Sequence, residues 1–255
     1  MIEKVRRELE LLRDLGFTHL DLRSSATGSD EEMKRKGPAG KSEGGRAVAA
    51  SPSDDQPLIG GVFPRDEQIV AAPDLLTLGL TAAPCTRCRL ASTRTQVVFG
   101  TGNPDADLMF IGEAPGRDED LAGEPFVGRA GQLLTDIIKA MKMTREQVYI
   151  ANVIKCRPPE NRNPEPDEME ACRPYIERQI EFIKPRVIVT LGRFALQSIL
   201  QRPLAISSVR GQWQSLGAIK VMPTYHPAYL LRTPSAKKDV WADMKKVMVE
   251  LGISW

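Results

Sequence analysis

The chain has 255 residues, 42% of them hydrophobic, and a net charge of +2 at pH 7. This length and composition suffice for one sizeable domain with an apolar core. No apolar run approaches the roughly 20 residues that cross a bilayer, and nothing at the N-terminus resembles a secretory signal. We therefore expect a soluble cytoplasmic protein without a membrane partner.

The charges are distributed unevenly along the chain. Residues 1–74 carry 11 basic and 14 acidic side chains, whereas residues 75–255 carry 24 and 19. The mildly basic second part is compatible with a polyanionic partner, although solvated surface charge gives similar totals.

The chain begins with two segments that we expect to lie outside the main domain. Within residues 1–23, apolar residues recur at three- and four-residue spacing among charges, which predicts an amphipathic helix. Docking on its own domain and contact with a protein partner are both open interpretations of that helix. Residues 24–64 hold almost no large apolar side chains and predict a disordered linker. The folded domain is expected over residues 65–255.

Beyond residue 88, short apolar runs alternate with helical patterns. Strands are expected at 108–111, 148–154, 187–191 and 219–222, and helices at 130–143, 166–183, 193–201 and 236–251. Strands that alternate with helices need crossover connections, which predicts an α/β fold: a three-layer αβα sandwich around a mostly parallel four-stranded sheet. Ligands of such sheets bind at the carboxyl ends of the strands.

The four cysteines of the chain form one close pair and two distant single residues: Cys85, Cys88, Cys156 and Cys172. Four thiolates brought together by the fold would suit either zinc or an iron–sulfur cluster. Unrelated buried thiols are the alternative interpretation. Disulfides fit less well, because a chain of this length seldom needs them.

A turn rich in glycine and acidic residues, GEAPGRDED at 112–120, follows the first expected strand. Its glycines and proline predict a tight turn whose backbone N–H groups approach a ligand. Glu113, Glu119 and Asp120 supply acceptors or a base. On this segment alone, an exposed acidic turn is the competing interpretation.

The next loop, GEPFVGRAG at 123–131, superficially resembles a phosphate-binding loop. It lacks the lysine and the hydroxyl that such a loop uses, which argues against nucleotide hydrolysis. Phe126 within it is either a core residue or a platform on which a planar base stacks.

Two polar side chains are expected at the same edge of the sheet. Asn152 lies in an otherwise apolar strand, where its amide is costly to bury without hydrogen bonds. A fixed amide offers a donor and an acceptor side by side, which suits the edge of a pyrimidine. His226 directly follows the last strand, and this position favours a functional role over the structural one that is commoner for a lone histidine.

Two segments have the character of DNA contacts. The loop after Cys156 carries Arg157 and Arg162 among prolines, which indicates phosphate contact or plain surface rigidity. Apolar residues 229–231, which include Leu230 and Leu231, precede Arg232. This arrangement is typical of a wedge that unstacks a duplex and is flanked by phosphate contacts.

Together these motifs resemble the family 4 uracil-DNA glycosylases, the iron–sulfur members of the uracil-DNA glycosylase superfamily. The resemblance spans about residues 84–252 and rests on the cysteine spacing and on GEAPGRDED, GEPFVGRAG, NVIKCRPPENRNP and HPAYLLR. Glu113 favours family 4 over its family 5 relatives. The chain also lacks the basic, histidine-bearing insertion with which one relative traps itself covalently on DNA.

The resemblance implies a base-excision-repair enzyme that flips uracil out of single- or double-stranded DNA and hydrolyses its N-glycosidic bond. Phe126 would stack on the base, Asn152 would read O4 and N3–H, and His226 would donate to O2. Gly112 and Ala114 would line the uracil site. The resemblance also implies a [4Fe-4S] cluster in place of zinc, most economically as a structural element. We expect a monomer in the cytoplasm of a prokaryote, associated with the nucleoid.

Ala114 is a departure from the wider superfamily, because the classical uracil-DNA glycosylases place a water-activating aspartate in this turn. Water must then be positioned differently, by Glu113, Glu119 or Asp120, and reaction with little help from a general base stays open. Glu119 has an alternative role in excluding the methyl group of thymine. Three other functions stay open: a catalytically silent DNA-binding relative, a glycosylase for another deaminated base, and a zinc-stapled hydrolase of another base.

Overall fold

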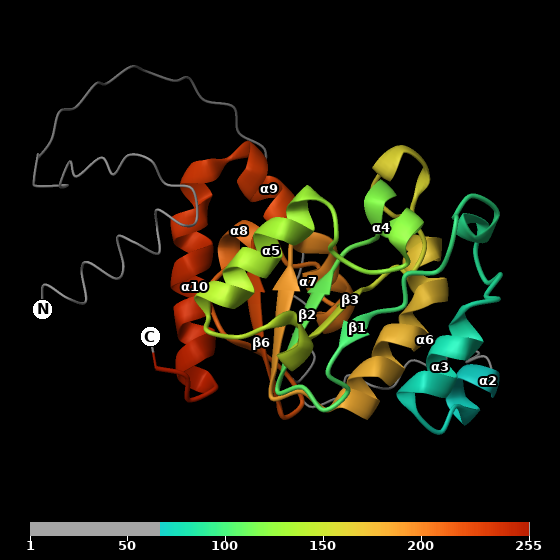
Figure 1. The fold of residues 1–255 in the computed structure, drawn as a ribbon, viewed down its shortest axis with the longest axis horizontal. Helices are drawn as coiled ribbons and strands as arrows, with labels where there is room; N and C mark the ends of the chain where they lie inside the picture. The colour runs from blue at the N-terminus through green and yellow to red at the C-terminus, as the bar shows by residue number, and fades with distance from the viewer. Residues whose placement is uncertain (1–66, 255) are drawn as a thin grey trace, which may run out of the picture. The chain divides into compact units, whose positions relative to one another are not determined.

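The computed structural model describes residues 67–254, which form a β-sheet covered by helices (Figure 1). The expected N-terminal helix at 1–23 and the whole of the expected linker at 24–64 lie outside the described residues, as do residues 65 and 66 at the start of the expected domain. Among the helices of the described part, none is long and apolar enough to cross a membrane.

The sheet of the described residues has six strands in the order β1-β3-β2-β4-β6-β5. The strands are β1 (Thr101–Gly102), β2 (Leu108–Gly112), β3 (Tyr149–Asn152), β4 (Val187–Leu191), β5 (Gln214–Leu216) and β6 (Ile219–Thr224). The four central strands run parallel, and β1 and β5 pair antiparallel at the two edges. The expected parallel sheet is therefore confirmed. The expected count of four strands falls short by the two edge strands.

Helices connect the strands and cover the sheet. They are α2 (Glu67–Ala71), α3 (Leu75–Ala82), α4 (Arg117–Ala122), α5 (Arg129–Ala140), α6 (Pro166–Ile183), α7 (Arg193–Leu200), α8 (Ile206–Val209), α9 (Pro227–Arg232) and α10 (Lys237–Glu250). Four short 3₁₀ turns, η1 (Arg89–Ser92), η2 (Arg145–Gln147), η3 (Pro159–Asn161) and η4 (Pro234–Ala236), complete the described elements. The four expected helices correspond to α5, α6, α7 and α10.

Three of the four apolar runs form strands that are buried along their whole length. Every residue of β2, β3 and β4 is buried, as expected of parallel strands with helices on both faces. Met109 and Ile111 of β2 pack in one cluster with Ile176 of α6 and Leu196 of α7. Figure 1 shows α5 on the other side of the strands from α7. The layers are therefore helix, sheet and helix.

The parallel strands bring distant parts of the sequence to one edge of the sheet. Gly112 at the end of β2 lies in register with Asn152 at the end of β3. Leu191 at the end of β4 lies in register with Thr224 at the end of β6. The loops that carry the candidate site residues leave the sheet at these carboxyl ends.

Candidate active site

A cavity of about 450 Å³ opens at this edge of the sheet. Its wall comes from the turn after β2, the loop before α5, the end of β3 with its following loop, and α9. The lining residues are Glu113, Ala114, Pro115, Gly116, Glu119, Phe126, Ala130, Asn152, Pro158, Asn161, Arg162, His226, Ala228, Tyr229 and Arg232. Side chains far apart in the sequence thus meet around one space large enough for a planar base.

Phe126 is packed tightly between the sheet edge and the histidine. Its ring centroid lies 5.5 Å from that of His226, with the planes inclined by 32°. Its φ of +56° is a left-handed conformation that is costly for an aromatic residue. Arg145 donates to the carbonyl of Phe126 at 3.2 Å and to that of Pro125 at 2.8 Å, which helps to hold this backbone.

Gly112 does not line the cavity but lies directly behind it. A Cβ at this position would collide with Oδ1 of Asn152 and with the ring of Phe126. Glycine is therefore required for the close packing of the two residues that we expect to contact the base.

Asn152 has an unpaired acceptor at the cavity. Its side chain is 1% exposed, and within the described residues its Oδ1 has no hydrogen-bond partner. An unpaired buried oxygen is costly, and a ligand that supplies a donor removes the cost. The arrangement is suited to a ligand N–H.

His226 caps the N-terminus of α9 and is held as a neutral imidazole. Its Nδ1 accepts a hydrogen bond from the backbone N–H of Ala228 at 3.1 Å. Burial, reinforced by the positive charge of Arg232, lowers the pKa of His226 to about 4. At neutral pH the proton is therefore on Nε2, which can donate to a ligand.

Glu113 is a carboxyl group whose charge is poised to change near neutral pH. Burial raises the pKa of Glu113 to about 7, although the positive charge of Arg193 opposes the shift. A carboxyl group with such a pKa at a cavity wall is a candidate for proton transfer or for orienting water.

The other two acidic candidates have backbone partners. Glu119 lines the cavity, but Oε1 accepts from the backbone N–H groups of Val127 and Gly128 at 2.9 Å each, and Oε2 from that of Gly116 at 3.1 Å. Asp120 is 3% exposed, and both carboxylate oxygens accept from the backbone N–H of Thr95. Asp120 is not among the residues that line the cavity, so its expected catalytic role stays a prediction to which the cavity adds no support.

The expected DNA contacts divide into exposed and buried residues. Leu230 is 1% exposed and belongs to the core, which contradicts its expected place in an apolar wedge. Its neighbours Tyr229 and Leu231 are exposed, because successive residues of a helix point in different directions. Arg162 and Arg232 line the cavity. Arg157 does not line it, and its Nε donates to Oδ1 of Asn161 at 2.8 Å.

The four cysteines surround a second, smaller cavity, which Cys85, Cys88, Cys156 and Cys172 line together. Arg94 Nη1 lies 3.3 Å from Sγ of Cys156, and the backbone N–H of Lys155 donates to Sγ of Cys172 at 3.3 Å. In residues 67–254, no three side chains of His, Cys, Asp or Glu form a group that could hold a single metal ion.

Lys155 is a residue of interest that the sequence interpretation missed. It is 2% exposed, and its Nζ donates to the backbone carbonyl of Asn152 at 2.7 Å and to Oε1 of Gln179 at 2.5 Å. Together with its backbone bond to Cys172, this ties the strand end that carries Asn152 to the cysteine cavity. A lysine at the end of a buried apolar run was the available signal, since an ammonium group there must find partners.

The sheet order and the cavity at the carboxyl ends of its parallel strands define an α/β protein with a ligand cavity whose lining includes an aromatic ring, an amide and carboxyl groups. A sequence model described as "Uracil DNA glycosylase superfamily" matches residues 99–245. The chain is 48% identical to the type-4 uracil-DNA glycosylase of Archaeoglobus fulgidus over 171 aligned residues. The aligned residues cover 64% of this chain and 86% of the relative.

Further relatives agree with this match. The type-4 uracil-DNA glycosylase of Thermotoga maritima is 49% identical over 168 residues, or 64% of this chain and 86% of the relative. The type-5 uracil-DNA glycosylase of Pyrobaculum aerophilum is 27% identical over 175 residues, or 62% of this chain and 77% of the relative. The chain therefore belongs to the uracil DNA glycosylase superfamily and, within it, to the type-4 uracil-DNA glycosylases.

Proposed function

We propose that this protein removes uracil from DNA by hydrolysing the N-glycosidic bond, as a glycosylase of base excision repair. Its type-4 relatives carry that activity in their names. The observation that carries the proposal is the buried Oδ1 of Asn152, which lacks a partner in the described residues and lines the same cavity as neutral His226.

Recognition of the base would use Asn152 and Phe126. A base must leave the stack before its glycosidic bond can be reached. Oδ1 of Asn152 would accept from N3–H of uracil, and its amide N–H would donate to O4. Cytosine presents the opposite pattern at these two positions, so the same amide disfavours it. Phe126 would support one face of the ring.

Bond cleavage would depend on His226. Departure of the base leaves an oxocarbenium-like sugar and a uracil anion. Nε2–H of neutral His226 would donate to O2, where negative charge grows during cleavage. A hydrogen bond that strengthens in this way stabilises the transition state more than the bound substrate.

Water would be oriented by Glu113, since the turn has Ala114 where the classical uracil-DNA glycosylases are expected to have an aspartate. Glu113 lines the cavity with the base-reading residues, and a pKa of about 7 leaves much of it ionised at neutral pH. Glu119 has three backbone donors on its oxygens. We assign it to holding the wall that faces the uracil C5 edge.

Contact with uracil-containing DNA would involve the rim of the cavity. Arg162 and Arg232 line it, and the exposed Tyr229 and Leu231 lie on the same short helix as Arg232. This supports phosphate contacts beside an apolar tip that enters the gap left by the flipped base. We propose that the protein acts as a monomer; a protein partner for residues 1–23 remains a prediction.

A [4Fe-4S] cluster would be held by the four cysteines around the second cavity. The donor set fits, because four thiols line one space and N–H groups of Arg94 and Lys155 approach two of the sulfur atoms. When bound, the cluster would supply a cross-link between the segment of Cys85 and Cys88, the loop after β3, and α6. No step of base removal needs it.

The test is release of free base from oligonucleotides that carry one uracil, hypoxanthine, thymine or cytosine. Rapid release of uracil alone is expected. Binding of uracil-containing DNA without release of any free base would identify the protein as a catalytically inactive DNA-binding relative. Preferred release of another base would contradict the assigned specificity.

A further inference from the structure

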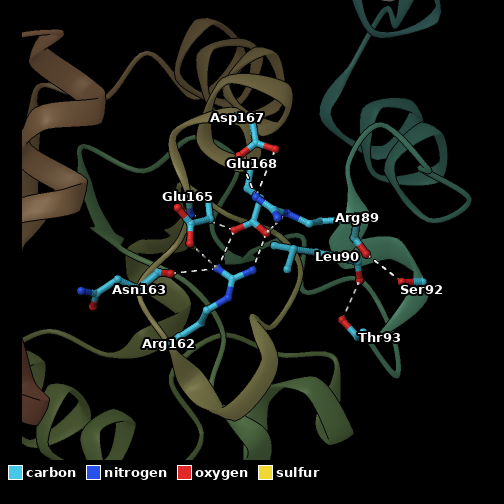
Figure 2. Close-up of polar contacts among 9 residues, drawn as sticks. All are labelled: Arg89, Leu90, Ser92, Thr93, Arg162, Asn163, Glu165, Asp167 and Glu168. Atoms are coloured by element: carbon cyan, nitrogen blue, oxygen red, sulfur yellow. Dashed lines mark hydrogen bonds and ion pairs between the residues drawn. The ribbon is translucent and has the colours of Figure 1, made fainter.

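Glu168, in the first turn of α6, is a buried carboxylate held between two arginines, as Figure 2 shows. Its side chain is 0% exposed. Its oxygens accept from Arg162 Nη1 at 2.9 Å and Nη2 at 2.6 Å, and from Arg89 Nε at 3.0 Å. The backbone N–H of Glu165 donates to it at 2.8 Å. We name Glu168, Arg89 and Arg162 the Glu168 clamp.

The clamp joins the same three segments of the chain as the cysteine cavity. Each of its residues lies close in sequence to a cysteine: Arg89 to Cys88, Arg162 to Cys156, and Glu168 to Cys172. The cysteines line one cavity whose lining includes none of the clamp residues, and the clamp is made by protein atoms alone, as Figure 2 shows. The clamp therefore joins the three segments without a cofactor.

The loop of residues 157–163 follows Cys156, carries Arg162 of the clamp, and forms part of the candidate active site. Pro158, Asn161 and Arg162 line the cavity. Glu160 and Asn161 have φ values of +54° and +55°, a left-handed conformation that non-glycine residues adopt only when their surroundings impose it. The wall of the cavity therefore depends on the contacts that hold the ends of this loop.

Arg162 is held in one place by the clamp. It binds the carboxylate through both terminal nitrogens, and Nη1 also donates to the carbonyl of Asn163 at 2.9 Å. These three bonds use three of the five N–H groups of a guanidinium, so among the described contacts two remain for a ligand. A side chain that is already ordered loses less entropy when it binds a phosphate.

We propose that Glu168 is a positioning residue that fixes Arg162 and the 157–163 wall for contact with DNA. The proposal deepens the proposed function and rests on it. A buried ion pair is by itself weak evidence for stability. This pair, however, connects Arg162 in the wall of the cavity to the helix that carries Cys172.

The test compares Glu168→Gln with Glu181→Gln. Glu181 is the matched control, because it lies on the same helix, pairs with Arg178 at 2.6 Å, and is remote in sequence from every cavity-lining residue. Three quantities are measured: amide hydrogen exchange of residues 157–163, affinity for an oligonucleotide with non-cleavable 2′-fluoro-2′-deoxyuridine, and the single-turnover rate at saturating DNA.

For Glu168→Gln we expect faster exchange in 157–163 and about tenfold weaker binding, the effect of one charge-assisted contact. The saturating rate should stay within about twofold, because the reacting groups are untouched. Glu181→Gln should leave all three quantities unchanged. Unchanged exchange and affinity in Glu168→Gln would overturn the proposal.

Arg162→Lys separates positioning from charge and also covers the case in which Glu168→Gln does not fold. Lysine keeps the charge but cannot bind the carboxylate through two nitrogens. It should therefore reproduce the weaker binding, and the double variant should bind no worse than either single variant. Normal affinity in Arg162→Lys would contradict the clamp. Failure of the wild type to release uracil would instead contradict the proposed function, since exchange and affinity do not depend on cleavage.

Discussion

Glu113 and His226 occupy one cavity, yet burial moves their pKa values in opposite directions. Burial disfavours the charged form of each group, so the pKa of the carboxyl rises to about 7 and that of the imidazole falls to about 4. Between these two values the histidine is neutral and most of the glutamic acid is protonated. Of these two groups, Glu113 is therefore the one whose ionisation changes near neutral pH.

The pH dependence of uracil release tests this assignment. Since Glu113 is protonated below its pKa, the single-turnover rate should rise with pH through about 7 and then level off. Protonation of His226 should not contribute above about pH 5. Glu113→Gln should remove the rise and lower the plateau by roughly a factor of 100. A rise of the same size in Glu113→Gln would assign the titration to another group.

Replacement of His226 tests its role as a donor to O2. His226→Ala should lower the single-turnover rate by roughly 100- to 1,000-fold. Affinity for non-cleavable uracil analogue DNA should change little, because the bond strengthens mainly in the transition state. Weaker binding with an unchanged rate would show that His226 only holds the base.

The long helices and the buried central strands could be predicted from the sequence, whereas the shortest helices and the edge strands could not. α6 has the expected bounds, with a proline and acidic residues in its first turn. The edge strands β1 and β5 have two and three residues, too few to show an alternating pattern. α9 has only six residues. Its apolar residues 229–231 were predicted to act together as one wedge, although Leu230 is buried in the core.

The two leucines of α9 test the corrected interpretation of this helix. Leu230→Ala should lower the free energy of unfolding by about 2 to 5 kcal/mol, because it leaves a cavity in the core. Leu231→Ala should change it by less than about 0.5 kcal/mol and should weaken binding to uracil-containing duplex DNA. Chemical denaturation and fluorescence anisotropy measure the two effects. The reverse pattern would restore Leu230 to the DNA-binding surface.

For the whole molecule, the sequence indicated which residues gather at one sheet edge, because parallel strands end together. It could not show contacts that depend on packing between distant segments. Lys155 reaches the carbonyl of Asn152, and Glu168 binds Arg89 and Arg162, through geometry that no local pattern records. The burial of Asp120 by a backbone contact to Thr95 was likewise invisible in an acidic turn.

The four cysteines come from separate segments of the chain and line one cavity, where we expect a [4Fe-4S] cluster. Protein purified without oxygen should be brown and contain about four irons per chain. Cys→Ala at any of the four positions should chiefly reduce folding yield and solubility. Iron and zinc analysis checks this, and stoichiometric zinc without iron would contradict it.

Asn152→Asp, assayed by single-turnover release of uracil and of cytosine, tests whether Asn152 reads the edge of the base. An ionised carboxylate has no donor for O4 of uracil, so uracil release should fall steeply. A protonated carboxyl matches the amino group and N3 of cytosine, so any cytosine release that is gained should increase as the pH falls. Near-normal release of uracil by Asn152→Asp would contradict the account, because Asn152 would then not read the base.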